Sequence, residues 1–544
     1  MDSRKVGSTV VVTLCAAFAF TPATFGSAAA VRVYRDVTLG TAVRSGPPAL
    51  QAPLAPEAST RARGTRRTHG VAARMPAAGT PTASPSALGA SSGLLTNFNG
   101  VGSRDSENTN FGLEFEPPDQ GLCAGNGYVL DMVNSAYTVY STSGRTIAGP
   151  FNVNGPFNEG LTEFTSDPRC YYEAATHTWY ATILQINRES NGSNIDIAVN
   201  HSGNPTTVWT VYRVNTTGMG GSSGPKEPGC PCFGDQPTLG VDAFNLYVTT
   251  NQFSILGSQF NGAQIYAFAK KDLVSLSPEV HFAHFRKLES GGAVAASVQP
   301  AITTGASPAE YFLNSLNPNA TFDDRVGVWA MTNRKAVAEG STPTLSSLVI
   351  TSEAYGEPVE AEQKGSASVI AQDDDRMQQT QYIAGSIWGE LSTSITLPGD
   401  AAVRDAAAWF QVKPKLSEEL ISGATMHRQG YVAVSGNYLL YPALQVAPSG
   451  TAAMVMTLTG EKHFPSAAYS LLEGEASAFG TVRVAATGTG PYDKEAERWG
   501  DYSWAALDPS GESTWLATEY VPPKSSQTTD GLHNWGTRVF RVGG

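Results

Sequence analysis

Four aspartates hold matching places in the chain, each at the start of a repeated unit. They are Asp119, Asp167, Asp235 and Asp501. Arg169 and Arg498 stand close to two of them. Carboxylates that converge from several repeats can bind a cation or the hydroxyl groups of a ligand. A single Asp at a turn can instead accept hydrogen bonds from nearby backbone N–H groups. The shared place favours a common site, and the capping alternative stays open.

The unit that would position these acids is clearest in Ser166–Ile186. An acidic turn opens it, a short strand and the turn-like Glu173–Thr176 follow, and Trp179–Ile186 supplies a second, aromatic-rich strand. Alternating apolar residues, broken by Gly, Pro, Asn or Asp turns, recur along the chain, and long helical periodicity is nearly absent. The sequence therefore predicts an all-β fold.

Related units begin near residues 119, 167, 235, 299, 379, 441 and 501, which are 48, 68, 64, 80, 62 and 60 residues apart. Repeats of this length, each worth about four strands, are typical of propeller blades. We expect a single β-propeller of about seven four-stranded blades, closed by pairing of Trp535–Val542 with Leu94–Phe98. Two tandem β-sandwiches are the alternative. The first strand of each blade lines the channel, so the acids would meet at one mouth.

The chain is predicted to divide into three segments. Residues 1–30 read as an export signal, because Arg4 and Lys5 precede an apolar run, Val10–Phe20, that is too short to span a bilayer. Residues 31–93 hold eight Arg and two acidic residues and lack hydrophobic periodicity, so we expect a disordered linker or pro-segment. Residues 94–544 form the propeller domain. No other stretch is long and apolar enough to cross a membrane, so we expect a secreted, extracellular protein.

The charge balance indicates the class of partner, and the cysteines indicate the cellular compartment. Residues 94–544 hold 26 basic and 45 acidic residues, a balance that repels nucleic acid. We expect a monomer whose partner is an extracellular glycan or protein. Four cysteines remain after export: Cys123, Cys170, Cys230 and Cys232. An oxidising location favours two disulfides, and of the three connectivities we predict Cys123–Cys170 and Cys230–Cys232.

Motifs across about residues 110–542 resemble those of a group of uncharacterised secreted, bacterial-type β-propeller proteins. They are Pro117-Pro118-Asp119-Gln120-Gly121, Gly430–Leu458, and Arg498-Trp499-Gly500-Asp501-Tyr502-Ser503. This resemblance implies fold and secretion but no activity. More distantly, Asp508–Trp515 is similar to the Asp-box turn of sialidase-type propellers, with its Gly one place late and Ala506 replacing the Ser. Such a turn is structural rather than catalytic.

The sialidase likeness supplies the alternative function, an extracellular glycan-active hydrolase or lyase. Such an enzyme needs arginines for a carboxylate, an acid, and a Tyr nucleophile backed by a Glu. The candidates for the positive charge and for the hydroxyl are Arg169, Arg376, Arg428, Arg498, Tyr171 and Tyr502. No residue is assigned as the Glu. The acidic triplet Asp373–Asp375 is predicted to be a solvated loop.

We therefore predict a propeller that binds a ligand or partner at its channel mouth, with no catalytic residue assigned. The predicted ligand-binding residues are the four aspartates with Arg169, Arg498 and Tyr502. The same four aspartates are the predicted ligands of a bound calcium ion.

Overall fold

The computed structural model describes residues 30–45, 80–112, 115–161, 163–187, 189–221, 224–316, 318, 322–492, 498–524 and 534–544. The predicted export signal lies outside these residues, apart from its last position. In the described ranges the chain is all-β, as predicted, and its helical elements are short: α1 (Ser103–Thr109), α2 (Lys270–Val274) and the 3-10 turn η1 (Arg334–Glu339). None of the described helices is long and apolar enough to cross a membrane.

The strands follow one another as four-stranded antiparallel meanders. The first three contain β5 (Gly121–Gly125), β6 (Tyr128–Val133), β7 (Ala136–Ser141) and β8 (Thr146–Asn152); β9 (Phe164–Glu173), β10 (Thr178–Asn187), β11 (Gly192–Asn200) and β12 (Thr210–Asn215); and β13 (Cys232–Val241), β14 (Asn245–Ser254), β15 (Phe260–Ala269) and β16 (Glu279–Phe285). Short turns join the first two strands of each of these meanders, as the turn residues in the sequence predict. The last two strands are joined by a longer connection in the second and third meanders, and in the third it contains α2.

The later meanders repeat this order. They contain β19 (Gln299–Thr303), β20 (Glu310–Ser315), β21 (Asp323–Thr332) and β22 (Thr344–Tyr355); β23 (Met377–Ile383), β24 (Ser386–Thr396), β25 (Val403–Ser417) and β26 (Leu420–Val432); β27 (Tyr438–Val446), β28 (Ala452–Gly460), β29 (His463–Leu472) and β30 (Val482–Ala486); and β31 (Trp504–Leu507), β32 (Ser513–Tyr520) and β33 (Gly536–Gly543) with β4 (Leu94–Gly102). A two-residue hairpin pair, β17 (Glu289–Ser290) and β18 (Ala293–Val294), lies between two of them.

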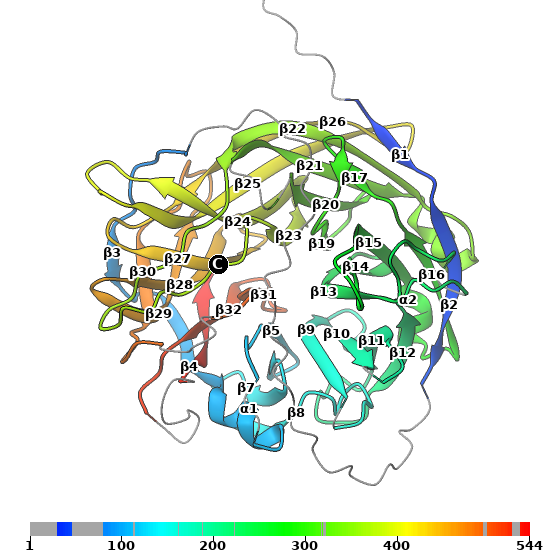
Figure 1. Cartoon of the computed structure of the whole chain (residues 1–544), viewed down its shortest axis with the longest axis horizontal. Helices are drawn as coiled ribbons and strands as arrows, with labels where there is room; N and C mark the ends of the chain where they lie inside the picture. Colours follow the sequence, from blue (N-terminus) through cyan, green and yellow to red (C-terminus); the bar gives the residue numbers. More distant parts are fainter. Residues whose placement is uncertain are drawn as a thin grey trace, which may run out of the picture.

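The meanders are arranged around a common centre (Figure 1). The strand that opens each meander, which we call its first strand, contacts the first strand of the next: β5 contacts β9, β9 contacts β13, and so on through β19, β23, β27 and β31. β31 in turn contacts β5, so the first strands form a closed ring. β33 from the chain's end pairs antiparallel with β4, with Val539 opposite Phe98 and Val542 opposite Leu94. The predicted closing pair of strands is confirmed.

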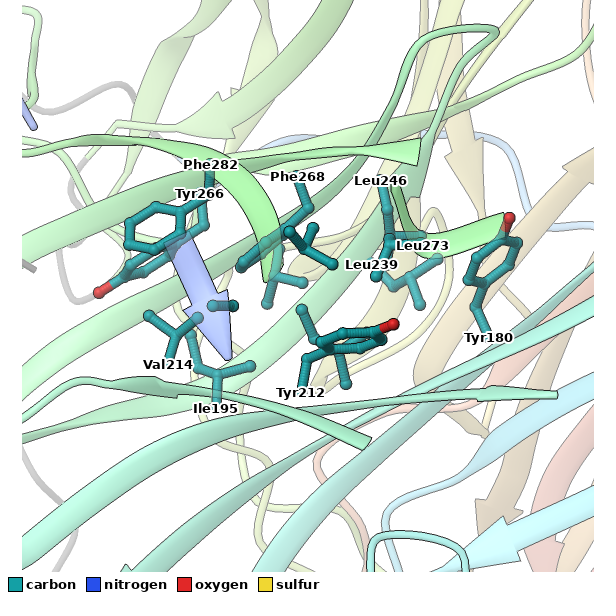
Figure 2. Close-up of a cluster of buried hydrophobic side chains, with 14 of the residues drawn as sticks. Tyr180, Ile195, Tyr212, Val214, Leu239, Leu246, Tyr266, Phe268, Leu273 and Phe282 are labelled. Atoms are coloured by element: carbon teal, nitrogen blue, oxygen red, sulfur yellow. The ribbon is translucent and has the colours of Figure 1, made fainter. Parts of the chain in front are cut away.

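Neighbouring meanders pack face to face, so both faces of a strand are buried. One such layer is shown in Figure 2, where Tyr180, Ile195 and Tyr212 of one meander meet Leu246 and Phe268 of the next. A single four-stranded sheet could not bury both of its apolar faces alone. This explains why strands such as β14 are buried at every position instead of alternating.

Both predicted disulfides are confirmed. Cys123 of β5 bonds to Cys170 of β9, with their Cα atoms 5.6 Å apart, so one bridge joins two adjacent first strands. Cys230 bonds to Cys232 at the start of β13. The first bridge pins the beginning of one meander to the beginning of the next.

Part of the segment predicted to be disordered is ordered in the structure. β1 (Arg32–Tyr34) pairs with β22, β2 (Val37–Arg44) pairs with both β16 and β12, and β3 (Leu88–Ala90) pairs with β30. We call Arg32–Arg44 the strap. The prediction of disorder was wrong for these strands, because open sheet edges accept a strand through backbone hydrogen bonds alone. Most of the strap's side chains stay at the surface, including the apolar Val33, Leu39 and Val43. Residues 46–79 lie outside the described residues.

Candidate functional site

The starts of several first strands meet at one end of the ring, which we call the mouth. Asp119 precedes β5, Asp167 lies near the start of β9, and Asp501 precedes β31. Asp119 and Asp167 are buried and have left-handed backbone angles, with φ of 49° and 61°. Asp is one of the few residues with a side chain that adopts this conformation readily. These kinks turn the two carboxylates toward the neighbouring strands.

A chain of hydrogen bonds connects these starts. Asp119 Oδ1 accepts the backbone N–H of Asp501 at 2.7 Å, and Asp119 Oδ2 accepts the Asn134 side-chain amide at 2.7 Å. The Asn134 carbonyl oxygen accepts the N–H of Asp167 at 2.7 Å, and Asp167 Oδ2 accepts the N–H of Gln236 at 3.0 Å. Asp119 and Asp167 therefore latch successive meanders together. This is the capping alternative, with the capped N–H groups on neighbouring units.

Asp235 does not occupy the place that the repeat predicted for it. Asp235 is half-buried and lies one residue before the position equivalent to Asp167. Gln236 occupies that position, and its backbone N–H donates to the Asp167 carboxylate. Gln236 has a φ of 48° and is followed by Pro237, just as Asp167 is followed by Pro168. Aligning the units on the residue before proline, instead of on the acid, would have identified the correct position.

The outer part of the mouth contains a cluster of charged side chains. The sequence predicted Arg498 and Asp501 as ligand-binding residues there, but not Asp373. Asp373 comes from the loop before β23, and Arg498 and Asp501 come from the loop before β31; a β-bridge between Ala371 and Arg498 holds the loops together. Arg498 Nη2 donates to Asp501 Oδ1 at 2.5 Å, and the Asp373 and Asp501 carboxyl groups are within hydrogen-bonding reach of each other. Side-chain exposure is 34% for Arg498 and 17% for Asp501, so a ligand can reach both.

Arg376 completes this cluster from the side of β23. Its guanidinium group binds both oxygens of Asp374, at 2.6 and 2.7 Å, and Nη1 donates to the Gln236 side-chain carbonyl at 2.5 Å. We call Asp373, Arg376, Arg498 and Asp501 the mouth cluster. The triplet Asp373–Asp375 is therefore not the solvated loop that was predicted, since Asp374 and Asp375 are buried. Its position just before a first strand was the overlooked signal.

The acids of the mouth differ in the direction of their pKa shifts. Burial and the nearby Asp501 carboxylate raise the pKa of Asp373 to about 8. Burial, together with neighbouring carboxylates, also raises the pKa values of Asp119 and Asp167. Burial acts to raise the pKa of Asp501 too, but Arg498 and the hydrogen bond from Asp373 outweigh it and hold that pKa below its usual value. At neutral pH a protonated Asp373 therefore donates to an ionised Asp501.

Arg169 and Tyr502, two of the predicted ligand-binding residues, form part of the wall beneath the mouth. Both are buried, and the Arg169 guanidinium carbon lies 3.2 Å from the centre of the Tyr502 ring and 4.4 Å from that of Trp504. Arg169 Nη1 donates to the Gln120 carbonyl at 3.3 Å. This cation–π stack packs the inside of the ring. Arg428, in contrast, lies over Trp388, and its guanidinium donates to backbone carbonyls of Gly474 and Ala476.

The four predicted metal ligands do not form a coordination shell. Within the described ranges, no group of three or more His, Cys, Asp or Glu side chains could hold a metal ion. Backbone N–H groups, the Asn134 amide and Arg498 already bind carboxylate oxygens of Asp119, Asp167 and Asp501. The geometry gives the predicted calcium site no support at these residues.

Comparisons with known proteins give distant structural likenesses only. No family model matches the chain, and no curated protein matches it. An α-L-arabinofuranosidase from Fusarium graminearum aligns with a TM-score of 0.34 and 10% identity over 82% of this chain and 98% of its own. Drosophila Semaphorin 1b gives 0.34 and 9% over 84% and 87%, and Trypanosoma rangeli sialidase gives 0.32 and 10% over 70% and 55%. Alignments of this quality assign no activity.

Proposed function

We propose that the chain is a secreted, seven-bladed β-propeller that binds a hydroxyl-rich ligand of the carbohydrate class at its mouth. The blade count is supported by the closed order of first strands and by the pairing of β33 with β4. An oxidising, extracellular location is supported by the two disulfides. Four-stranded sheets closed in this way are the construction of a propeller.

The observation that carries the ligand proposal is the pair Asp373 and Asp501, flanked by Arg498 and Arg376. A protonated carboxyl donates, a carboxylate accepts, and guanidinium groups donate in a planar fork, so the cluster offers both partners that a sugar hydroxyl needs. Positive and negative groups nearly balance here, which favours a neutral ligand over a strongly charged one. The ring brings these side chains to one end, where an extended ligand can approach.

The hydrolase alternative gains little from the same geometry. Carboxyl pairs in glycosidases stand about 5–5.5 Å apart in retaining enzymes and about 6.5–9.5 Å apart in inverting ones. Asp373 and Asp501 are within direct hydrogen-bonding reach of each other. The candidate nucleophile Tyr502 is buried beneath Arg169. Binding without bond cleavage is therefore the better-supported function.

A glycan array of neutral and acidic oligosaccharides, probed with the full chain purified after export, tests the proposal. We expect neutral oligosaccharides to bind, with a loss of about tenfold or more in affinity for Asp501→Asn. Glu279→Gln is the matched control, because Glu279 is exposed at the start of β16, a strand that contributes no residue to the mouth cluster. An array on which the parent binds nothing, or equal binding by Asp501→Asn, would contradict the proposal. Release of reducing ends from a bound glycan would favour the hydrolase instead.

A further inference from the structure

A set of buried, unpaired oxygens lies where the ring closes. Glu519 of β32 and Asp131 of β6 are fully buried, and so is Gln120 just before β5. Among the described residues, no hydrogen bond of good geometry reaches either carboxyl oxygen of Glu519 or Asp131 Oδ1, and the side-chain amide of Gln120 makes none beyond its close approach to Asp131. Unpaired buried carboxyl oxygens are costly, and native structures contain few of them.

The fold brings these oxygens together. Glu519 is directly opposite Thr537 in the β32–β33 pair, so their side chains lie on the same face of the sheet. Thr537 donates its hydroxyl to Asp131 Oδ2 at 2.9 Å. The Glu519 and Asp131 carboxyls are close enough to repel each other, and the Gln120 side chain approaches Asp131. The Thr537 side chain therefore contacts Asp131 and projects from the same sheet face as Glu519.

Two glycines let the backbone pass close to the carboxyl groups of Glu519 and Asp131. A Cβ on Gly500 would lie 3.1 Å from Glu519 Cδ, and a Cβ on Gly100 would lie 2.1 Å from Asp131 Oδ2. Any larger residue would displace the carboxyl groups. The backbone therefore approaches both acids closely, from β4 and from the loop before β31.

We propose that Glu519, Asp131 and Gln120 bind a hard, oxygen-preferring cation of the calcium class between the first and last blades. Two carboxylates neutralise a divalent charge, and the amide oxygen adds a ligand of the kind calcium accepts. With two acids and one amide, the set differs from the three-acid groups considered above and shares no residue with the calcium site predicted at the mouth. The cation joins β6 and β32 at the junction of the two chain ends.

The test is calcium content and thermal stability of the full chain, purified with chelator and then dialysed against calcium. The parent is expected to retain about one calcium per chain by elemental analysis, and its Tm is expected to rise by roughly 2 °C or more over the chelated sample. Glu519→Gln keeps the side-chain shape and removes one charge, so both effects should disappear. Asp131→Asn should behave in the same way.

Glu390→Gln is the matched control, since Glu390 is a fully buried glutamate on the second strand of another meander. It should keep the bound calcium. A parent without stoichiometric calcium and with identical Tm in calcium and chelator would overturn the proposal. Retention of calcium by both Glu519→Gln and Asp131→Asn would overturn it as well.

Discussion

Replacing Asp405 with Asn should make stability less dependent on pH. Asp405 of β25 is fully buried, and its Oδ1 accepts the backbone N–H of Val359 at 2.7 Å. Burial raises its pKa from the ordinary 3.8 to about 8, although Gln372, the Val359 N–H and Arg404 act to lower it. The folded protein therefore keeps a proton on Asp405 at pH values where the unfolded chain has lost it.

The sign and size of the effect follow from this difference. A group with a raised pKa in the folded state stabilises fully below its unfolded pKa, and that stability is lost as pH rises toward the folded pKa. For Asp405 the window runs from about pH 4 to about pH 8. At about 1.4 kcal/mol for each pH unit, the loss across the window is of order 5 kcal/mol.

Urea unfolding at pH 5, 7 and 9 measures this change. Asn stays neutral at all three values and can still accept from Val359, so Asp405→Asn should be equal to the parent or slightly less stable at pH 5 and clearly more stable at pH 9. The exposed substitution Asp324→Asn should show no such trend. The reasoning is refuted if the difference in unfolding free energy between Asp405→Asn and parent is the same at pH 5 and pH 9.

Three further predictions concern the stability of the fold. The double variant Cys123→Ser, Cys170→Ser removes a disulfide between residues 47 positions apart, which should lower the unfolding free energy by about 4 kcal/mol. A loss below about 1 kcal/mol would contradict this prediction. Deleting residues 31–45 should speed hydrogen exchange in β12 and β16, which β2 covers, and leave β29 unchanged; uniform protection would contradict this. In Gly125→Ala the new Cβ would stand 1.9 Å from the Tyr172 ring, so a loss of about 2 kcal/mol or more is expected, whereas Gly423→Ala, which meets nothing within 4 Å, should be neutral.

The sequence predicted the strands and their closure because those features depend on local pattern. β10 extends the predicted strand Trp179–Ile186 by one residue at each end, and β33 pairs with β4 as expected. Turn residues mark strand ends, and apolar runs mark burial between sheets. The strap was missed because it is a short apolar stretch inside a segment otherwise rich in Pro, Ala and Arg, and because edge pairing uses the backbone.

The acids were harder to interpret, because a shared place in a repeat does not determine a shared role. Asp119 and Asp167 connect neighbouring meanders through hydrogen bonds, while Asp501 is partly exposed and pairs with Arg498. Asp373 was missed because adjacent acids are usually solvated, and only the fold shows that its loop lies beside that of Arg498. The buried Glu519 and Asp131 carboxyls have no sequence signature, since the residues around them come from β4, β6, β32 and β33.

Whether the mouth binds the ligand is tested most directly by hydrogen exchange with and without a saturating oligosaccharide chosen from the array. Binding at the mouth cluster should slow exchange in 371–376 and 498–502 and leave the outer strands β8, β12 and β16 unchanged. Asp501→Asn should abolish that protection without altering exchange in the free protein elsewhere. Protection confined to an outer strand, or none at 371–376 and 498–502, would contradict a ligand site at the mouth.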